Sequence, residues 1–338
     1  MTQTMTRSCS RQRLAMLFAS VLLCVLATLM PNRAQAQTCT ATVSTLSFGT
    51  ISPITRAAVN GSGTINVTCN WTVVSLAPTA LVCLNLNAAQ PRVLTQAGGT
   101  ATLQYDLYSD QAHSTSWGSS AAATTPISVT IQQPVLGTSA TVSIPYYGQI
   151  AANQPTVPTT NNADTTYSHA FSGGETSLMY GYYLLGILGP PGCSSLTTNG
   201  GSLPFTVTAN VTNNCNISAS NIVFPAAGVL TSALAATGTI TAQCTNGDAF
   251  KIALNGGSSN QVNARTMVLS GGNATVGYQI YSDSQHATPW GDGTNGTSTV
   301  NGTGSGNTAS FTMYGVVPAQ STPAPGNYTD SVTATISF

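Results

Sequence analysis

Charge is the scarcest property of this sequence, because only sixteen of its 338 residues are charged, eight basic and eight acidic. That is 5% of the chain, against about 25% in an ordinary soluble domain. Hydrophobic residues still make up 42%, which argues against disorder, since disordered chains combine low hydrophobicity with high net charge. The lack of a basic surface argues against nucleic-acid binding, which needs cations to neutralise phosphates.

Motifs of catalysis and metal binding are also missing. The sequence contains no G-x-S-x-G elbow, no C-x-x-C pair and no nucleotide or calcium loop. Glu175 is the only glutamate and the other acids are scattered, so no carboxylate pair for glycoside hydrolysis stands out. His113 and His286 lie close to Asp110 and Asp283, but a duplicated Asp/His pair is better interpreted as the framework of a repeat. We therefore expect no enzymatic activity, no metal and no cofactor.

Long apolar runs are absent except near the N-terminus. Three arginines within residues 7–13 precede a mostly apolar stretch over Leu14–Met30, and Ala34–Ala36 fits the A-x-A cleavage pattern. This order predicts a secretory signal peptide over residues 1–36. An N-terminal membrane anchor is the alternative, disfavoured because the apolar run is short for a span. Cleavage would leave four basic and all eight acidic residues, a formal charge of −4.

Six cysteines remain after the predicted cleavage, and an even number in an exported chain indicates disulfides. Six cysteines allow fifteen pairings, so spacing has to discriminate between them. Two of the spacings are nearly equal, at 30 and 29 positions, which suggests one local bridge used twice and a third bridge between the cysteines left over. The expected pairs are Cys39–Cys69, Cys215–Cys244 and Cys83–Cys193.

The chain contains an internal repeat. Tyr105–Gly118 and Tyr278–Gly291 share Tyr, Tyr-Ser-Asp, His and Trp-Gly in register, at an offset of 173 residues. A Gly-Thr-Ile sequence before a cysteine lies upstream of both copies, and Tyr-Gly lies downstream of both. The period is that of a whole domain, which indicates duplication and not a solenoid. We expect a first module over residues 37–212 and a second over 213–338.

Both modules have the pattern of β-structure. Apolar and polar residues alternate over short segments such as Thr102–Tyr108 and Val276–Tyr281, and alternation buries one face of a strand while the other stays wet. Clusters of Gly, Asn, Pro and Ser separate these segments, and no long stretch with a helical period follows the predicted signal. The expected fold class is all-β, with two tandem β-sandwiches.

The order of these motifs resembles that of the spore coat protein U domain family. An early Cys is followed by a Phe-containing segment (Leu46–Gly49 or Ile222–Pro225), a G-T-I…C strand, Y-x-x-Y-S-D…W-G, Y-G, and Gly326–Asp330 before a terminal strand. The resemblance covers nearly the whole mature chain, and two tandem copies resemble the tip subunit, or adhesin, of archaic Csu-type chaperone–usher pili. It implies immunoglobulin-like, pilin-type sandwiches, the second incomplete and completed by donor-strand complementation.

The same resemblance implies export through the periplasm of a Gram-negative bacterium to a pilus tip at the cell surface. The implied partners are a periplasmic pilus chaperone, an outer-membrane usher, an adjacent pilin that donates a strand to the C-terminal domain, and an abiotic or host surface. Only Gln37 and Thr38 separate the predicted cleavage site from Cys39, so a subunit that accepts a strand without donating one is expected. The terminal-strand residues expected to contact the chaperone, or simply to pack in the core, are Val332, Ala334, Ile336 and Phe338.

The first module carries an addition that the second lacks. Tyr167–Phe171 aligns with Tyr328–Val332, which leaves residues 175–211 as extra sequence. We predict that the alternating segment 203–211 closes the first sandwich from within its own chain. A rival alignment makes 203–211 the counterpart of residues 331–338, with an insertion before it.

An apolar loop in this addition is the candidate surface-binding segment, because exposed apolar patches usually mark interaction sites. Burial in the core is the alternative for its residues. The loop residues are Leu184, Leu185, Ile187 and Leu188, with Cys193 at the base. Weaker candidates in neighbouring loops are Val73, Val74, Leu76, Val135 and Leu136.

A lectin-type pocket is a second binding hypothesis, in which Trp117 and Tyr146-Tyr147 stack on sugars. The counterpart of Trp117 at Trp290 favours a structural role instead. The leading functional prediction is an adhesive pilus tip subunit that mediates surface attachment and biofilm formation. The alternatives are a secreted structural coat protein, a non-adhesive minor pilus adaptor and a glycan-binding adhesin.

Overall fold

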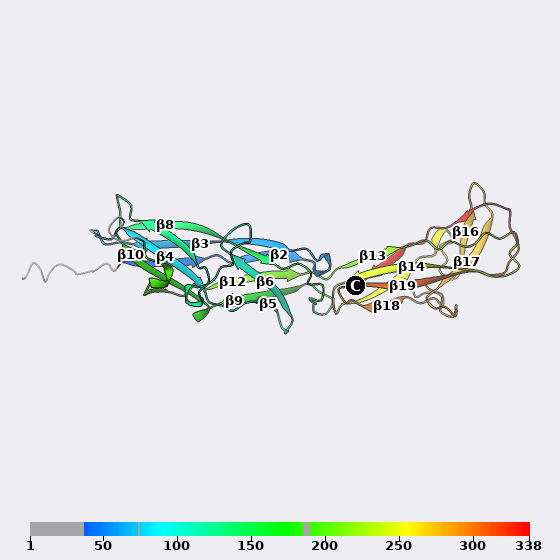
Figure 1. Cartoon of the computed structure of the whole chain (residues 1–338). Helices are drawn as coiled ribbons and strands as arrows, with labels where there is room; N and C mark the ends of the chain where they lie inside the picture. Colours follow the sequence, from blue (N-terminus) through cyan, green and yellow to red (C-terminus); the bar gives the residue numbers. More distant parts are fainter. Residues whose placement is uncertain (1–36, 74, 185–189) are drawn as a thin grey trace, which may run out of the picture.

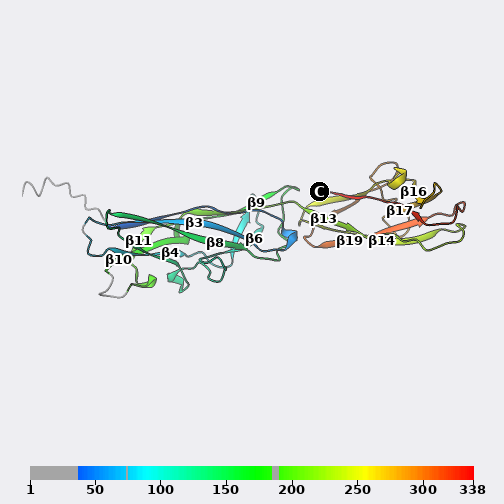
Figure 2. The same cartoon turned by 90° about the horizontal axis from the view of Figure 1, so that it is seen from above.

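The computed structural model describes residues 37–73, 75–184 and 190–338. The predicted signal peptide lies outside the described residues, as do Val74, Leu185, Ile187 and Leu188. Two β-sandwiches lie end to end, and the C-terminus lies near their junction (Figures 1 and 2). The described residues contain no α-helix and five short 3-10 turns, so the predicted all-β class with two tandem sandwiches is confirmed. The turns are η1 (Pro53–Thr55), η2 (Ser120–Ala122), η3 (Gly173–Glu175), η4 (Cys193–Ser195) and η5 (Gly257–Ser259).

The first sandwich consists of a large and a small sheet. The large sheet has the strand order β1-β3-β8-β6-β5-β9-β12-β2 and the small sheet the order β11-β10-β4-β7. The strands of the large sheet are β1 (Thr38–Val43), β2 (Leu46–Ile51), β3 (Val59–Asn70), β5 (Arg92–Gln96), β6 (Thr102–Tyr108), β8 (Ser139–Ile150), β9 (Thr165–Phe171) and β12 (Phe205–Val211). Those of the small sheet are β4 (Thr79–Leu86), β7 (Ile127–Gln132), β10 (Thr176–Tyr183) and β11 (Thr198–Gly201).

The second sandwich repeats this arrangement with fewer strands. Its large sheet has the order β13-β14-β19-β17-β16-β20 and its small sheet the order β18-β15-β21. The strands of the large sheet are β13 (Cys215–Ala219), β14 (Leu234–Cys244), β16 (Arg265–Leu269), β17 (Thr275–Tyr281), β19 (Thr308–Val317) and β20 (Tyr328–Thr329). Those of the small sheet are β15 (Ala249–Leu254), β18 (Val300–Thr303) and β21 (Ala334–Ser337).

Alternating burial along the strands builds the two cores. In β12, the residues Phe205, Val207, Ala209 and Val211 are buried and the residues between them are half-buried, as a period of two requires. Burial of each Val or Phe side chain contributes about 1.5–3 kcal/mol to stability. In β4 every residue is buried, which means that both faces of this strand are covered.

Three disulfides cross-link the sandwiches in the expected pairs. Cys39 and Cys69 face each other on β1 and β3, and Cys215 and Cys244 do so on β13 and β14, with Cα–Cα distances of 4.1 Å in both. The third bridge joins Cys83 of β4 to η4 and has no counterpart in the second sandwich. Each local bridge should stabilise its sandwich by about 3–4 kcal/mol through the reduced entropy of the unfolded chain.

Candidate functional site

The two sandwiches correspond strand by strand, so each functional residue of one has an identifiable counterpart in the other. Equivalent strands pair in the same register in both sandwiches. This includes the later strand, which is β9 in the first sandwich and β20 in the second. The matched pairs are Arg92↔Tyr105 with Arg265↔Tyr278, and Gln96↔Tyr167 with Leu269↔Tyr328. Tyr167 and Tyr328 are therefore equivalent, as the sequence alignment predicted.

The strand that corresponds to the end of the chain is β10. Thr176 of β10 lies opposite Leu86 of β4, just as Ala334 of β21 lies opposite Leu254 of β15. The end of the chain, Phe338, therefore corresponds to Tyr180, and the addition to the first module begins after Tyr180, so its predicted start at residue 175 is wrong. The rival alignment of 203–211 with 331–338 is wrong for the same reason. The turn that carries η3 lengthens the connection in the first module, which hid the correspondence from the sequence.

The first sandwich is closed by its own chain. β12 lies between β9 and β2, antiparallel to β9 and parallel to β2. Val207 sits opposite His169 on one side and opposite Leu46 on the other, and its side chain is fully buried. The prediction that residues 203–211 complete this sandwich is confirmed.

The same position in the second sandwich is open. The large sheet ends at the two-residue strand β20, and the counterpart of β2, residues 222–225, is paired with no strand among residues 190–338. The gap therefore lies between β20 and residues 222–225, where β12 would lie in the first sandwich. The unpaired backbone groups on both sides form a ready template for another strand.

Burial differs accordingly between matched side chains. Leu46 and Phe48 are 0% and 6% exposed, whereas their counterparts Ile222 and Phe224 are only half-buried. A Cβ on Gly315 would lie 2.8 Å from Ile222 and 2.9 Å from Phe224, so both side chains pack directly on this glycine. The two side chains thus lie in place against the core, but nothing covers them within the described residues of the second sandwich.

The terminal strand lines the same open core. Ala334 and Ile336 of β21 are half-buried and pack against the second core, and so does Val332 just before the strand. Phe338 is 47% exposed. In β10 the matching inward residues are all buried, namely Thr176, Leu178 and Tyr180. The four predicted chaperone-contact residues therefore lie together along the incomplete sandwich, and their contact with a chaperone stays a prediction.

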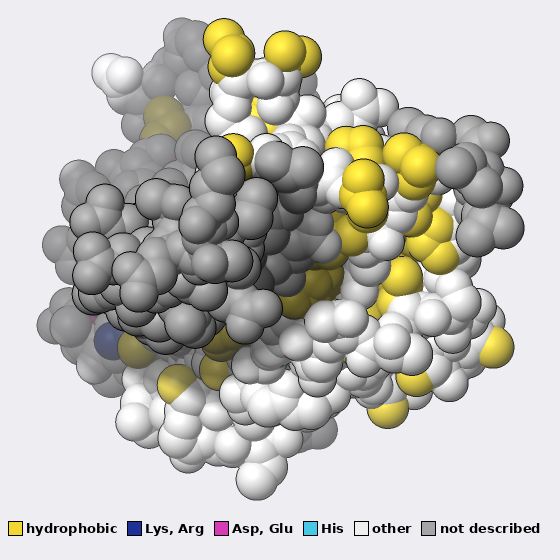
Figure 3. Space-filling view, turned by 90° about the vertical axis from the view of Figure 1, so that its left-hand side faces the viewer, with side chains coloured by type: hydrophobic (Ala, Val, Ile, Leu, Met, Phe, Trp, Pro, Cys, Tyr) yellow, Lys and Arg dark blue, Asp and Glu magenta, His cyan; other side chains and the backbone are white. Residues whose placement is uncertain are grey.

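Three loops meet at the end of the first sandwich that lies far from the junction. Strand pairing places Asn70 opposite Ser139 and Thr79 opposite both Gln132 and Tyr183, so the loops that begin or end at these residues share one end. Hydrophobic side chains gather in patches on this end (Figure 3). Their exposed fractions are 82% for Val73, 87% for Leu76, 100% for Val135, 93% for Leu136 and 42% for Leu184. We call these five residues the distal apolar cluster.

The bases of the distal loops are well ordered by hydrogen bonds. The backbone N–H of Trp71 donates to the carbonyl of Thr138 at 2.7 Å, and that of Gln133 donates to Pro78 at 2.7 Å. The hydroxyl of Tyr182 donates to the carbonyl of Asn70 at 2.7 Å, and burial raises the pKa of this phenol, so it stays protonated. The exposed apolar side chains are therefore carried by a fixed support.

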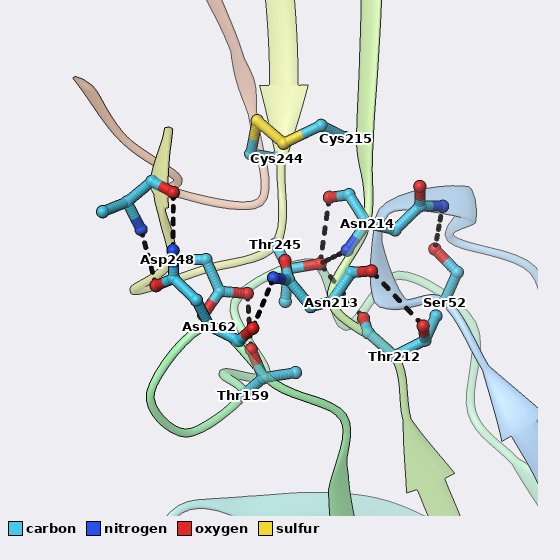
Figure 4. The surroundings of a disulfide bond; sticks show 11 residues. Ser52, Thr159, Asn162, Thr212, Asn213, Asn214, Cys215, Cys244, Thr245 and Asp248 are labelled. Carbon is cyan, nitrogen blue, oxygen red and sulfur yellow. Dashed lines mark hydrogen bonds between the residues drawn. A yellow bond between two sulfur atoms is a disulfide. The ribbon is translucent and has the colours of Figure 1, made fainter. Parts of the chain in front are cut away.

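The equivalent end of the second sandwich is polar and forms the junction (Figure 4). The side chain of Asn162 binds the backbone of Ala249 twice, donating to its carbonyl at 2.8 Å and accepting from its N–H at 3.0 Å. Asn246 donates to the carbonyl of Thr156 at 2.8 Å, and Asn214 donates to Ser52 at 3.2 Å. These hydrogen bonds run from loops of one sandwich to loops of the other and hold them end to end.

A buried carboxylate lies within this junction. Asp248 is 1% exposed, and the hydroxyl of Thr159 in the first sandwich donates to it. Burial raises the pKa of Asp248, against the opposing effect of the Thr159 hydrogen bond. The junction is therefore mainly polar, and the guanidinium of Arg56 in the first sandwich also donates across it to Asn307 in the second.

Comparison with protein families identifies the repeated module. The family model of the spore coat protein U domain matches residues 25–168 and again residues 202–335, which together make up most of the chain. The chain belongs to the spore coat protein U domain family. The two matches correspond to the two copies that the repeated motifs predicted.

Solved structures show a weaker likeness. A chain of the CsuC–CsuE chaperone–tip adhesion subunit pre-assembly complex, from archaic chaperone–usher Csu pili of Acinetobacter baumannii, is 15% identical with a TM-score of 0.47. The match covers 89% of this chain and 100% of that chain. A chain of a chaperone–tip adhesin complex of CFA/I fimbriae is 9% identical with a TM-score of 0.29, covering 87% of this chain and 95% of that one. Similarity of this degree identifies neither a partner nor an activity. No curated protein matches the chain.

The shared aromatic residues are structural in both spore coat protein U domains. Trp117 and Trp290 are 0% exposed, and their indole N–H groups donate to the carbonyls of Leu84 and Ile252 at 2.8 and 3.0 Å. Tyr146 is also fully buried. Trp117 and Tyr146 therefore cannot stack on a sugar at the surface, and the lectin hypothesis built on them is wrong. Tyr146 lies on the inward face of β8, and Trp117 is buried although it lies outside the strands.

The repeated Asp and His residues shape a turn in each domain. Asp110 accepts from the backbone N–H groups of Ser114 and Thr115, which lowers its pKa, and Asp283 is held low by the equivalent bonds from Ala287 and Thr288. The histidines in these turns have φ of 55°, and their rings lie against tyrosines.

Metal-binding clusters and membrane-spanning helices are both absent from the described residues. Among the described residues, no group of three His, Cys, Asp or Glu side chains could hold a metal ion. No helix within these residues is long and apolar enough to cross a membrane.

Proposed function

We propose that this protein is the adhesive tip subunit of an archaic chaperone–usher pilus. The second domain would accept a strand from the next pilin, and the first would attach to surfaces. One observation carries the proposal: the strand position filled by β12 in the first domain is open in the second. A chain with one closed and one open sandwich can take a single donor strand, which is the requirement at the end of a fibre.

The physics of the open position is that of β-augmentation. Backbone hydrogen bonds to β20 and residues 222–225 would supply affinity, and alternate side chains of the donor would cover Ile222 and Phe224. Until that strand arrives, the exposed edge invites aggregation, so a periplasmic chaperone would occupy it during passage to the outer-membrane usher. Val332, Ala334, Ile336 and Phe338 are the residues proposed to face the chaperone.

Assembly can be tested by co-expression in the periplasm with a pilus chaperone. The chain should accumulate as a stable complex with the chaperone and be degraded or aggregate without it. Ile336→Asp should abolish the complex, because the half-buried side chain packs against the open core. A chain that accumulates equally well as a free monomer would contradict the proposal.

Attachment is assigned to the distal apolar cluster. Nearly full exposure of Val135 and Leu136 is unfavourable in water, and desolvation against an apolar material would recover about 25 cal/mol for each Å² of apolar surface covered. The mature chain carries little charge, so there is little electrostatic barrier to such contact. The neighbouring Leu185, Ile187 and Leu188 belong to the same proposal but lie outside the described residues.

A matched pair of double variants tests this assignment. Val135→Asp with Leu136→Asp should reduce attachment of piliated cells to polystyrene by about tenfold or more, because two carboxylates would have to be desolvated. Gln111→Asp with Ala112→Asp adds the same charge at exposed positions of the Asp110 turn and should leave attachment unchanged. Equal attachment by both variants, with normal pilus assembly, would show that the cluster is not adhesive.

A further inference from the structure

The outer face of the small sheet is covered in the first domain but not in the second. Cys83 and Asn85, which point outward from β4, are 0% and 2% exposed. Their cover comes from η4, which the Cys83–Cys193 bridge holds against the strand, and from η2. In the second domain the counterpart of Asn85 is Ala253, which is half-buried, and no equivalent segment is tied over it. The cover is therefore an addition that the sandwich does not need for its own completion.

A pocket of about 510 Å³ opens between the two covering segments. This volume lies within the range of about 300–1,000 Å³ that small-molecule sites occupy. Its polar lining includes Asn85, Ser120, Ser177 and Ser194, and its apolar lining includes Met179 and Leu196. No ionisable side chain lines it, since its only cysteine is in a disulfide. The pocket thus offers amide and hydroxyl groups beside a small apolar wall.

Asn85 lines this pocket, and its amide nitrogen makes only long hydrogen bonds. Its Oδ1 accepts from the backbone N–H and the hydroxyl of Ser120 at 2.9 and 3.0 Å, which fixes the orientation of the amide. Its Nδ2 reaches only the carbonyls of Cys83 and Ser177, both at 3.5 Å, beyond the usual range of about 2.7–3.2 Å. A buried N–H that is so weakly bound is unfavourable, so an oxygen acceptor in the pocket would gain a full hydrogen bond.

We propose that this pocket binds a neutral saccharide of one or two rings. An uncharged sugar presents hydroxyl oxygens to the Nδ2 of Asn85 and to the serines, and a face of C–H groups to Met179 and Leu196. The uncharged lining gives no counter-ion for an acidic or basic ligand, which selects for neutral sugars. The site is separate from the distal apolar cluster, because Asn85 lies six positions along β4 from Thr79, where the distal loop ends.

Binding can be measured on the full mature chain held in complex with its chaperone. Calorimetry and saturation-transfer NMR against free neutral mono- and disaccharides should detect saturable binding, and an array of the same sugars as surface-linked glycans tells whether attached forms also bind. Ala121→Trp should weaken binding by about tenfold or more by filling the pocket from η2. Thr294→Trp, at the equivalent exposed position of the second domain, is the matched control and should change nothing.

Three results would overturn the inference: no binding of any neutral sugar at millimolar concentration, binding that Ala121→Trp leaves intact, or a preference for charged sugars. Circular dichroism and thermal unfolding of both Trp variants confirm that they are folded. Attachment to polystyrene should be unchanged in Ala121→Trp, so a failure here is distinguishable from a failure of the adhesive proposal.

Discussion

The two domains share one framework, and two of their differences bear on assembly and attachment: the position of the closing strand and the end that carries the loops. In the first domain, β12 covers Leu46 and Phe48; in the second, Ile222 and Phe224 stay half-buried because no strand within the described residues covers them. Since the framework residues match pair by pair, this difference in burial follows from the missing strand and not from a different core. One module is therefore complete alone, whereas the other has an open strand position.

The two domains also differ in the loops at their equivalent ends. Residues 71–78 of the first domain occupy the place of residues 245–248 of the second, directly after the matched disulfides. The short second loop is polar and docks on the first domain through Asn246 and Asp248. The longer first loop carries Val73 and Leu76 and is exposed at the far end. The same end of the module thus serves protein contact in one copy and presents apolar side chains in the other.

The largest effect is expected from a substitution that disrupts β12, the strand that closes the first sandwich. Val207→Asp would bury a carboxylate between β9 and β2, because Val207 is 0% exposed. We expect the free energy of unfolding of the first domain to fall by about 4 kcal/mol or more. Denaturant unfolding followed by limited proteolysis measures this loss.

Thr206→Asp provides the control, because Thr206 lies on the half-buried outer side of the same strand. It should change the free energy of unfolding by only about 0.5 kcal/mol. Similar losses for the two variants would mean that β12 does not close the core.

Matched Phe→Ala substitutions compare how much one equivalent side chain contributes to the stability of each domain. Phe48→Ala should lower the stability of the first domain by about 3–5 kcal/mol, the usual loss for a buried phenylalanine. Phe224→Ala should lower that of the second domain by roughly half as much in the unassembled chain, because the side chain is only half-buried. Urea unfolding of each variant gives the two values, and equal losses would show that the second core is already covered.

The smallest expected effect is the change in stability of the second domain at low pH that depends on Asp330. Asp330 lies at the position of His169 in the first domain and is partly buried, which pushes its pKa up. Hydrogen bonds from Ser258, Tyr278 and the backbone outweigh burial, so its pKa lies below the ordinary 3.8. A lowered folded-state pKa stabilises the fold above pH 3.8 and loses this effect as pH falls through the folded value.

Asp330→Asn should therefore lower the stability of the second domain by about 1 kcal/mol at neutral pH, a figure reduced for partial exposure. The difference from the unsubstituted chain should shrink below pH 3.8. Asp248 should give the opposite pH dependence of stability, because its raised pKa favours the folded state at low pH. Asp248→Asn should therefore leave the stability at pH 7 unchanged or raise it. Thermal unfolding at several pH values separates the two, and parallel pH profiles for both variants would contradict the assignment.

Much of the fold was predictable because its signals are local. Nearly equal cysteine spacings predicted the disulfide pairs, and the Tyr and Trp motifs predicted the duplication. The parallel pairing of β12 with β2 was beyond sequence patterns, since it joins residues about 160 positions apart and depends on the whole sheet. The burial of Trp117 was missed because it follows a loop, where alternation no longer tells which face a side chain takes. The pocket that Asn85 lines was missed because its walls come from four segments far apart in the sequence.

The most direct test compares backbone hydrogen exchange in the matched segments, before and after a copy of residues 203–211 is fused behind Phe338 through a flexible linker. Before fusion, residues 46–51 and 165–171 should exchange slowly, whereas 222–225 and 328–333 should exchange fast. Fusion should slow exchange in the second pair of segments and leave the first pair unchanged. Equal protection in all four segments before fusion, or no change after it, would contradict the conclusion that the second domain awaits the strand that the first already has.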